Sequence, residues 1–169
     1  MEKHAVYKKE NIVDHYNETA ENYEQIYLRV GFNDPLKCAE LTAEVLGENR
    51  SNASVFDIGC GTGLVGQYLK EMGVSKIVGV DSSRGMLVQA GKKQAYEALD
   101  ELYISNVEAF PAKYHEKFDA VVASGMFAEG HLDVNGFDVM LAATKVGGYC
   151  VFATREMYLT QYNYQDKIT

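Results

Sequence analysis

The stretch that decides the fold is Asp57-Ile58-Gly59-Cys60-Gly61-Thr62-Gly63. It ends a short apolar run that starts at Ser54, and it precedes residues 64–72, whose apolar side chains recur at helical spacing. Glycines at alternate positions let the backbone turn sharply and admit a ligand close to it, since side chains there would collide. A strand, a glycine-rich turn and a helix in this order predict a ligand site facing the amides of a helix N-terminus.

Short apolar segments alternate with amphipathic ones around this turn. Strands are predicted at 54–58, 76–80, 102–105, 118–123 and 149–154, and helices at 11–28, 64–72, 83–98 and 135–145. A further helix should begin after Asp34, with Pro35 in its first turn, and end near Gly47. The predicted fold is therefore α/β, with a doubly wound, mostly parallel, Rossmann-like sheet. Residues 1–169 form one domain, with N-terminal helices in 1–50, a ligand-binding core in 51–156 and a short tail in 157–169.

The composition excludes several kinds of partner. The chain has 169 residues, is 47% hydrophobic and carries a net charge of −8, which argues against a nucleic-acid partner because such binders present a basic face. Residues 1–10 are polar, and no stretch approaches the roughly 20 apolar residues that cross a bilayer. Three widely spaced cysteines form neither a disulfide framework nor a zinc pattern. We expect a cytoplasmic protein with no metal site and no membrane partner.

Two acidic residues narrow the choice of ligand. Gly61 to Gly66 is a literal G-x-G-x-x-G, so a dinucleotide site has to be weighed. Asp57 and the additional Gly59 count against it, because a carboxylate beside the loop repels a pyrophosphate and suits a ligand with a cationic end. Asp81 lies 24 positions after Asp57, where an acid binds ribose hydroxyls in either kind of site. The alternative role of Asp81 is to stabilise a helix N-terminus.

These motifs together resemble the class I S-adenosylmethionine-dependent methyltransferases. The first motif of that family matches 57–63, and its second matches 79–83 followed by Met86. Further matches lie at 106–111, 118–122 and 144–149, so the resemblance spans about residues 11 to 156. A narrower resemblance, carried by 16–23, 128–131 and 153–155, is to the methyltransferase-like protein of the Williams-Beuren syndrome region.

The resemblance implies a set of cofactor-binding residues. The methionine portion would meet the glycine-rich turn, with Asp57 ordering its amino group, and the ribose would meet Asp81. The adenine would meet Met86 and the segment after the third strand, where Asn106 replaces the family's common acid. The predicted cofactor-binding residues are Tyr16, Tyr23, Asp57, Gly59, Cys60, Gly61, Gly63, Asp81, Ser82, Met86, Asn106, Val107, Ser124 and Gly125. The two tyrosines would close the site, or else serve only in helix packing.

The predicted reaction demands little of the side chains. Methyl transfer from a sulfonium has a neutral leaving group, so alignment matters more than a base unless the nucleophile is an amine or hydroxyl. His131 is the predicted catalytic base, with Glu129 a weaker candidate and a surface or packing role as the alternative. Residues 124–127 take the place of an Asn-Pro-Pro-Tyr motif, which disfavours DNA or amide-nitrogen chemistry.

The segment after the fifth strand departs from the family pattern. The family sheet adds a sixth and a seventh strand, whereas only 14 residues follow Arg155. The predicted sheet lacks those strands and leaves strand five as an open apolar edge. A short natural form, a trimmed domain or completion of the sheet in a homo-oligomer would each account for this.

The sequence thus predicts an S-adenosylmethionine-dependent methyltransferase. It would form S-adenosylhomocysteine and methylate a small molecule or a protein side chain. The second hypothesis is a non-catalytic S-adenosylmethionine-binding protein or a truncated methyltransferase domain, and the third is an NAD-dependent oxidoreductase.

Overall fold

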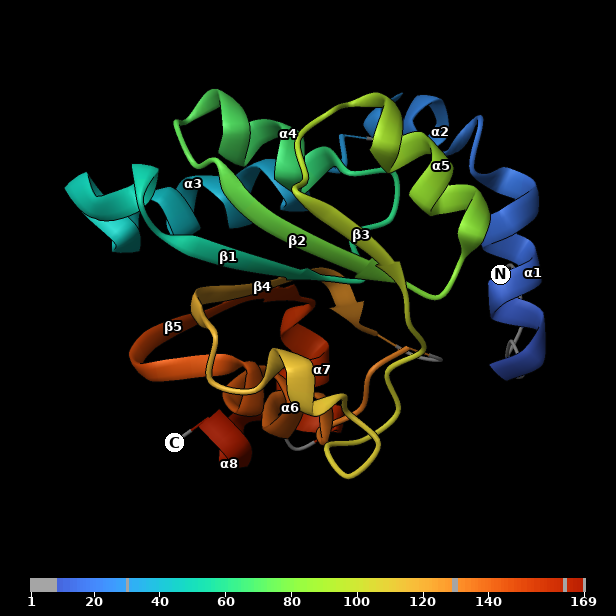
Figure 1. Cartoon of the computed structure of the whole chain (residues 1–169). Coiled ribbons are helices and arrows are strands. Elements are labelled where there is room, and N and C mark those ends of the chain that lie inside the picture. Colours follow the sequence, from blue (N-terminus) through green and yellow to red (C-terminus); the bar gives the residue numbers. More distant parts are fainter. Residues whose placement is uncertain (1–8, 30, 129–130, 163, 169) are drawn as a thin grey trace.

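A five-stranded parallel sheet forms the centre of the computed structural model, which describes residues 9–29, 31–128, 131–162 and 164–168. The strand order is β3-β2-β1-β4-β5 (Figure 1). The strands are β1 (Ser54–Ile58), β2 (Lys76–Asp81), β3 (Ala98–Glu101), β4 (Phe118–Phe127) and β5 (Thr144–Thr154). The doubly wound α/β prediction is confirmed, and the described residues contain no sixth or seventh strand.

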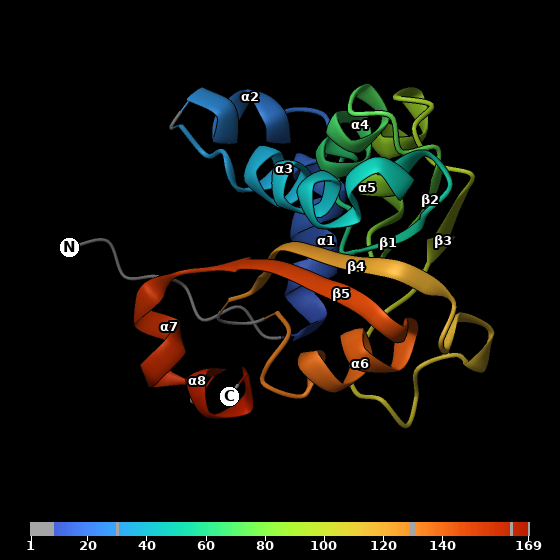
Figure 2. The same ribbon diagram turned by 90° about the vertical axis from the view of Figure 1, so that its left-hand side faces the viewer.

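Helices cover both faces of the sheet (Figure 2). On one face lie α3 (Asp34–Leu46), α4 (Leu64–Glu71) and α5 (Arg84–Lys92), and on the other lie α6 (Gly136–Ala143), α7 (Glu156–Gln161) and α8 (Tyr164–Ile168). α1 (Lys9–Thr19) stands at the end toward which β2 and β3 point, and α2 (Tyr23–Arg29) follows it (Figure 1). The described residues also form two 3-10 helices, η1 (Gly47–Ser51) and η2 (Ala112–Tyr114).

β1 separates two apolar cores because its side chains alternate between the faces of the sheet. Val55 belongs to the core beneath α3 and α4. Phe56 and Ile58 belong to the core on the opposite face, where Phe56 stacks on Phe118 with ring centroids 4.6 Å apart. The same alternation turns Asp57 to the Val55 side. A fully buried carboxyl therefore lies between the sheet and α3 and α4.

The strand order reverses at β1. The chain runs from β1 to β2 and β3 on one side and then crosses back to β4 and β5 on the other. The connections that leave β1 and β4 diverge, which opens a crevice at the carboxyl ends of these strands. The glycine-rich turn at 59–63 follows β1 directly, so the fold places it at this crevice.

The third strand lies earlier than the sequence predicts, at Ala98–Glu101 and not at 102–105. β3 is an edge strand whose residues are half-buried or exposed, so it needs no apolar run. The apolar residues Leu102, Tyr103 and Ile104 line a pocket and do not extend the sheet. The helix predicted at 83–98 ends at Lys92 for a related reason, because the chain must turn back toward β3 and Gln94 adopts a positive φ of 53°.

Two other predicted elements differ in extent. The helix predicted at 11–28 is two helices, because the chain turns at 20–22, where Ala20 is buried. β5 begins at Thr144, within the helix predicted at 135–145, because Thr144 pairs with Phe118 of β4. After an irregularity, regular pairing with β4 continues from Tyr149. The C-terminal segment forms α7 and α8, which place Tyr158 and Tyr164 in the core.

β5 is an edge strand, as predicted, with Tyr149 45% exposed. Pairing of two chains through this edge stays a prediction. Within the described ranges, no helix has the length and apolar character that crossing a membrane requires.

The packing of α6 on the sheet can be tested with two neighbouring residues. Met140 is fully buried and Leu141 is 63% exposed. Met140→Ala should lower the free energy of unfolding by about 2–5 kcal/mol, whereas Leu141→Ala should change it by less than about 0.5 kcal/mol. Both place alanine at a helical position, so helix propensity is matched. Urea denaturation followed by circular dichroism measures both, and equal losses would contradict this orientation of α6.

Candidate functional site

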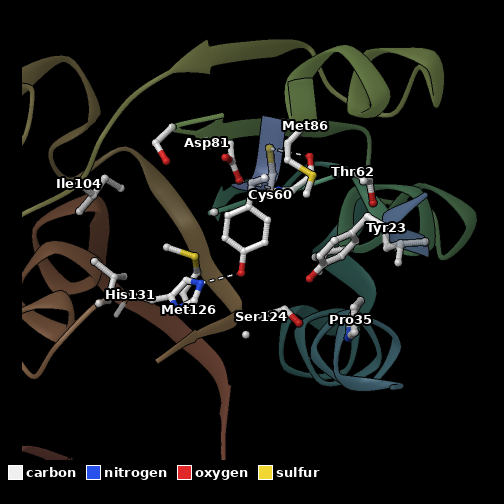
Figure 3. Close-up of a pocket in the computed structure, with 18 of the residues that line it drawn as sticks. Tyr23, Pro35, Cys60, Thr62, Asp81, Met86, Ile104, Ser124, Met126 and His131 are labelled. Atoms are coloured by element: carbon white, nitrogen blue, oxygen red, sulfur yellow. Dashed lines mark hydrogen bonds between the residues drawn. The ribbon is translucent and has the colours of Figure 1, made fainter. Parts of the chain in front are cut away.

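A pocket opens at the carboxyl ends of β1, β2 and β4 (Figure 3), and Ile12 and Tyr16 of α1 are among its lining residues. Most of the predicted site residues come together in its wall. Those that line it are Tyr16, Tyr23, Gly59, Cys60, Gly61, Asp81, Ser82, Met86, Ser124, Gly125 and His131. Tyr23, Cys60, Asp81 and Met86 surround the same space in Figure 3, although they come from four different segments.

The glycine-rich turn takes a backbone path that favours glycine. Gly59, Gly61 and Gly63 have positive φ values of 65°, 53° and 87°. A Cβ added at Gly61 would meet no atom within 4 Å, so its backbone conformation, not crowding, calls for glycine there. At Gly59 an added Cβ would come within 2.0 Å of Met126 Sδ, so a larger residue would require the flexible Met126 side chain to move as well as a strained backbone.

Asp81 ties the turn to the end of β2. Its Oδ2 accepts a hydrogen bond from the Gly61 N–H at 2.9 Å, and its Oδ1 accepts one from the Ser83 N–H at 2.8 Å. Burial raises the pKa of this carboxyl above its usual value, while the two amides and the charge of His131 act in the opposite direction. The carboxylate therefore faces the pocket in a fixed orientation.

Asp57 lies behind the turn and does not line the pocket. Its Oδ2 accepts a hydrogen bond from the Tyr96 hydroxyl at 2.7 Å. Its Oδ1 is buried and has no hydrogen-bond partner within the described part of the chain. Burial raises the pKa of Asp57 to about 7, with a smaller contribution from Asp81, and the bond from Tyr96 lowers it. A buried, partly unsatisfied carboxyl is costly and needs a reason.

A second buried polar side chain, that of Ser124 on β4, does line the pocket. Among the described residues, Ser124 Oγ has no hydrogen bond of normal geometry. The nearby thiol is that of Cys38 on α3, whose pKa burial raises to about 12 and Ser124 lowers slightly. Ser124 Oγ and Asp57 Oδ1 are thus two buried oxygens close to the first turn with capacity for a ligand.

The N-terminal helix covers the pocket through specific contacts. The Tyr16 hydroxyl and His131 Nε2 form a hydrogen bond of 2.8 Å, marked by a dashed line at His131 in Figure 3. The Tyr16 and Tyr23 rings meet edge to face at 6.0 Å. Asn17 Oδ1 accepts from the Ser83 hydroxyl at 2.8 Å and from the Gly85 N–H at 2.9 Å. The predicted base therefore lies in the pocket wall, paired with a tyrosine that the sequence assigned separately.

Three further predicted residues lie outside the pocket wall. Gly63 caps α4, where an added Cβ would come within 2.9 Å of Ala90 Cα. Asn106 is exposed, and its Oδ1 accepts a hydrogen bond from the Ala109 N–H at 2.9 Å. Val107 lies in the same turn. Glu129 falls outside the described residues.

Sequence reasoning missed much of the apolar part of the pocket. The lining residues that it did not assign are Ile12, Phe32, Pro35, Thr62, Leu64, Val65, Leu102, Tyr103, Ile104 and Leu132. The apolar run 102–104 was a usable signal, but it was interpreted as a strand. No lysine or arginine is among the lining residues that the structure describes, and no cluster of three metal-ligating side chains occurs in the described ranges.

The raised pKa of Asp57 predicts a pH-dependent stability. A carboxyl whose pKa is about 7 in the folded state and near 3.8 when unfolded destabilises the fold increasingly as the pH rises from about 4 to about 7, and no further above that. In Asp57→Asn this decline should be shallower by up to about 1.4 kcal/mol per pH unit. Urea denaturation at pH 5, 6 and 7 measures both slopes. Parallel slopes would contradict an Asp57 that takes up a proton on folding.

Comparisons with known proteins agree with this geometry. Residues 55–148 match the model of the methyltransferase domain. The chain is 31% identical over 140 residues to human methyltransferase-like protein 27, a match that covers 83% of this chain and 56% of that protein. The chain thus spans little more than half the length of this relative. The resemblance to the protein of the Williams-Beuren syndrome region is supported loosely, in that this relative is also a methyltransferase-like protein.

Solved structures with a similar fold are also methyltransferases. Magnesium protoporphyrin IX methyltransferase from Synechocystis PCC 6803, with S-adenosylmethionine bound, is similar with a TM-score of 0.61 and 17% identity over 95% of this chain and 86% of that one. Ribosomal protein L11 methylase from Lactobacillus delbrueckii subsp. bulgaricus is similar with a TM-score of 0.60 and 18% identity over 80% of this chain and 67% of that one. At these identities the similarity concerns the fold. The match to the family model over more than half of the chain shows that this chain belongs to the methyltransferase domain family.

Proposed function

We propose that this chain binds S-adenosylmethionine and transfers its methyl group to an acceptor bound in the same pocket. The observation that carries the proposal is Asp57 Oδ1, a buried carboxylate oxygen behind the glycine-rich turn that has no partner in the described chain. An ammonium group would satisfy both its charge and its hydrogen-bonding capacity. The methionine end of the cofactor would bring an ammonium group to the turn in front of Asp57, where the negative charge of the buried carboxylate favours a cation, whereas a pyrophosphate would bring two negative charges.

The rest of the pocket fits the remaining parts of this cofactor. Asp81 presents a fixed carboxylate to which ribose hydroxyls can donate. Met86 is buried beside Asp81 and offers a polarisable side chain to a purine face. Ile104 and Leu102 supply further apolar contacts in the pocket lining. Ser124 can accept from the ammonium group or donate to the carboxylate of the methionine portion.

The chemistry of the cofactor decides what the side chains of the pocket have to do. A sulfonium cofactor supplies an activated methyl group and a neutral leaving group. The protein then has to hold the acceptor in line with the methyl and exclude water. When the acceptor is an amine or a phenol, its proton has to leave, and we propose His131 as the base. With Nε2–H donating to the Tyr16 hydroxyl, which also fixes the orientation of the ring, Nδ1 would accept that proton.

The pocket wall favours a small acceptor without negative charge. Phe32, Met126 and Leu132 line its acceptor side with apolar atoms. Because the described lining has no lysine or arginine, an acceptor carboxylate or phosphate would be desolvated without a counter-charge. We therefore extend the proposal to a neutral or cationic small molecule, such as an amine or a phenol, ahead of a protein side chain.

Ligand binding can be tested by thermal shift with S-adenosylmethionine, S-adenosylhomocysteine and NAD. A ligand at 100 times its dissociation constant adds about 2.7 kcal/mol of stability, which corresponds to roughly 5–10 °C in a domain of this size. We expect such a shift with the first two ligands and none with NAD. Asp81→Asn should weaken S-adenosylhomocysteine binding by about tenfold to hundredfold through lost charge-assisted hydrogen bonds.

The matched control is Asp100→Asn at the end of β3. Asp100 bonds to Lys113 and Tyr114 and does not line the pocket, so this variant should bind like the wild type. A shift with NAD alone, or equal losses in the two variants, would overturn the proposed site. Transfer itself is measured with methyl-labelled S-adenosylmethionine against panels of amines, phenols and peptides, and label on peptides alone would refute the small-molecule acceptor.

A further inference from the structure

Tyr96 is a residue behind the pocket to which the sequence assigns no role. It lies in the connection between α5 and β3 and does not line the pocket. Its hydroxyl donates to Asp57 Oδ2 at 2.7 Å and accepts from the Gly66 N–H at 3.1 Å. Gly66 lies in the first turn of α4, and the N-cap of that helix, Gly63, offers no side-chain bond. Tyr96 therefore satisfies an amide that the helix itself leaves without a partner.

Three glycines make room for the Tyr96 ring. A Cβ added at Gly66 would come within 2.3 Å of the ring, one at Gly79 within 2.7 Å and one at Gly63 within 3.1 Å. The glycines come from α4, from β2 and from the end of the turn, so the slot is built by three separate elements. The last glycine of the G-x-G-x-x-G pattern thus leaves space for a tyrosine ring.

The direction of the hydrogen bonds at Tyr96 is fixed by chemistry. An amide N–H only donates, so the tyrosine oxygen must accept from Gly66. The single hydroxyl proton is then committed to Asp57 Oδ2. A proton donated to a carboxylate favours its ionised form and fixes its rotation. Oδ1 is left as the oxygen without a partner among the described residues.

We propose that Tyr96 is a positioning residue for the cofactor, which fixes the Asp57 carboxylate from behind the turn so that Oδ1 is presented to an ammonium group. This inference rests on the proposed function. The other titratable groups that face Asp57 are Asp81 from β2, Cys60 from the turn and Cys38 from α3, all of them acids. Among the groups acting on the pKa of Asp57, Asp81 raises it and Tyr96 lowers it. Tyr96 is thus the group that offsets part of the rise in the pKa of Asp57 that burial causes.

Tyr96→Phe tests this role, because it removes the hydroxyl and keeps the ring in its slot. If the pKa of Asp57 rises from about 7 by about one unit, the ionised fraction at pH 7 falls from about one half to about one tenth. Calorimetric titration should then show S-adenosylhomocysteine binding about fivefold weaker than in the wild type at pH 7, and less than about twofold weaker at pH 8.5. Recovery at higher pH is the signature of a charge effect, which misfolding would not produce.

Two controls separate positioning from a general structural role. The first is 5′-methylthioadenosine, which has the adenosine and sulfur of the ligand but no ammonium group, and which Tyr96→Phe should bind with unchanged affinity. The second is Tyr114→Phe, which also removes a tyrosine–aspartate hydrogen bond, to Asp100, away from the pocket. It should bind both ligands like the wild type at both pH values.

The outcomes distinguish this inference from the function on which it rests. A wild type that binds neither ligand overturns the proposed function and the role of Tyr96 together. If the wild type binds both ligands, three results for Tyr96→Phe would overturn the role of Tyr96 alone. They are equal weakening of both ligands, equal weakening of S-adenosylhomocysteine at the two pH values, and no effect on binding.

Discussion

The pairing of β1 with strands on both sides is the constraint on which the molecule depends. Val55 pairs with Ile77 of β2 on one side and with Ala120 of β4 on the other. A strand held in this way is buried on both faces and fixes where the polypeptide leaves the sheet. The turn after β1 must then fold over the ends of its neighbours, where the Gly61 amide meets Asp81 of β2. The crevice is a consequence of strand order, and its chemistry is added by a few polar groups at its rim.

Those polar groups are arranged at a cost to the stability of the protein alone. Asp57 is fully buried, and one of its oxygens has no partner in the described chain. Binding a cation there would return in ligand affinity part of the free energy that folding loses by burying the carboxyl. The apolar bulk of the pocket, from Ile12 and Phe32 to Leu132, then strengthens each polar contact by excluding water.

Much of this could be predicted from the sequence, because the signals are local. The strand at Ser54–Ile58, the turn and the helix after it are encoded in consecutive residues, and they appear with the predicted bounds to within one position. The predicted residues that line the pocket lie at strand ends or follow them closely, apart from two tyrosines of the N-terminal helices. Residues 102–104 misled because an apolar run that lines a cavity has the same composition as a strand that lines a core.

Other features are set by contacts that no local pattern reports. Tyr96 lies 39 positions from Asp57 in the sequence, within a segment predicted as helix, and nothing in its neighbourhood indicates that it turns inward. The pairing of Tyr16 with His131 spans 115 positions. Contacts of this kind depend on the whole fold. Periodicity and motif spacing can therefore indicate single residues, but they do not predict which of them lie in contact.

The slot around Tyr96 also constrains how this sequence can change. While the ring is present, a methyl group at Gly66 or Gly79 collides with it, so neither glycine can be replaced alone. A relative with a small residue in place of Tyr96 would remove the clash at Gly66 and leave only the end of the Leu99 side chain close to a Cβ at Gly79. It would need another donor for its buried acid. These positions should therefore vary together among related sequences, as residues in contact do. Among aligned relatives, a glycine at the position of Gly66 should then accompany a tyrosine at the position of Tyr96, whichever ligand the turn binds.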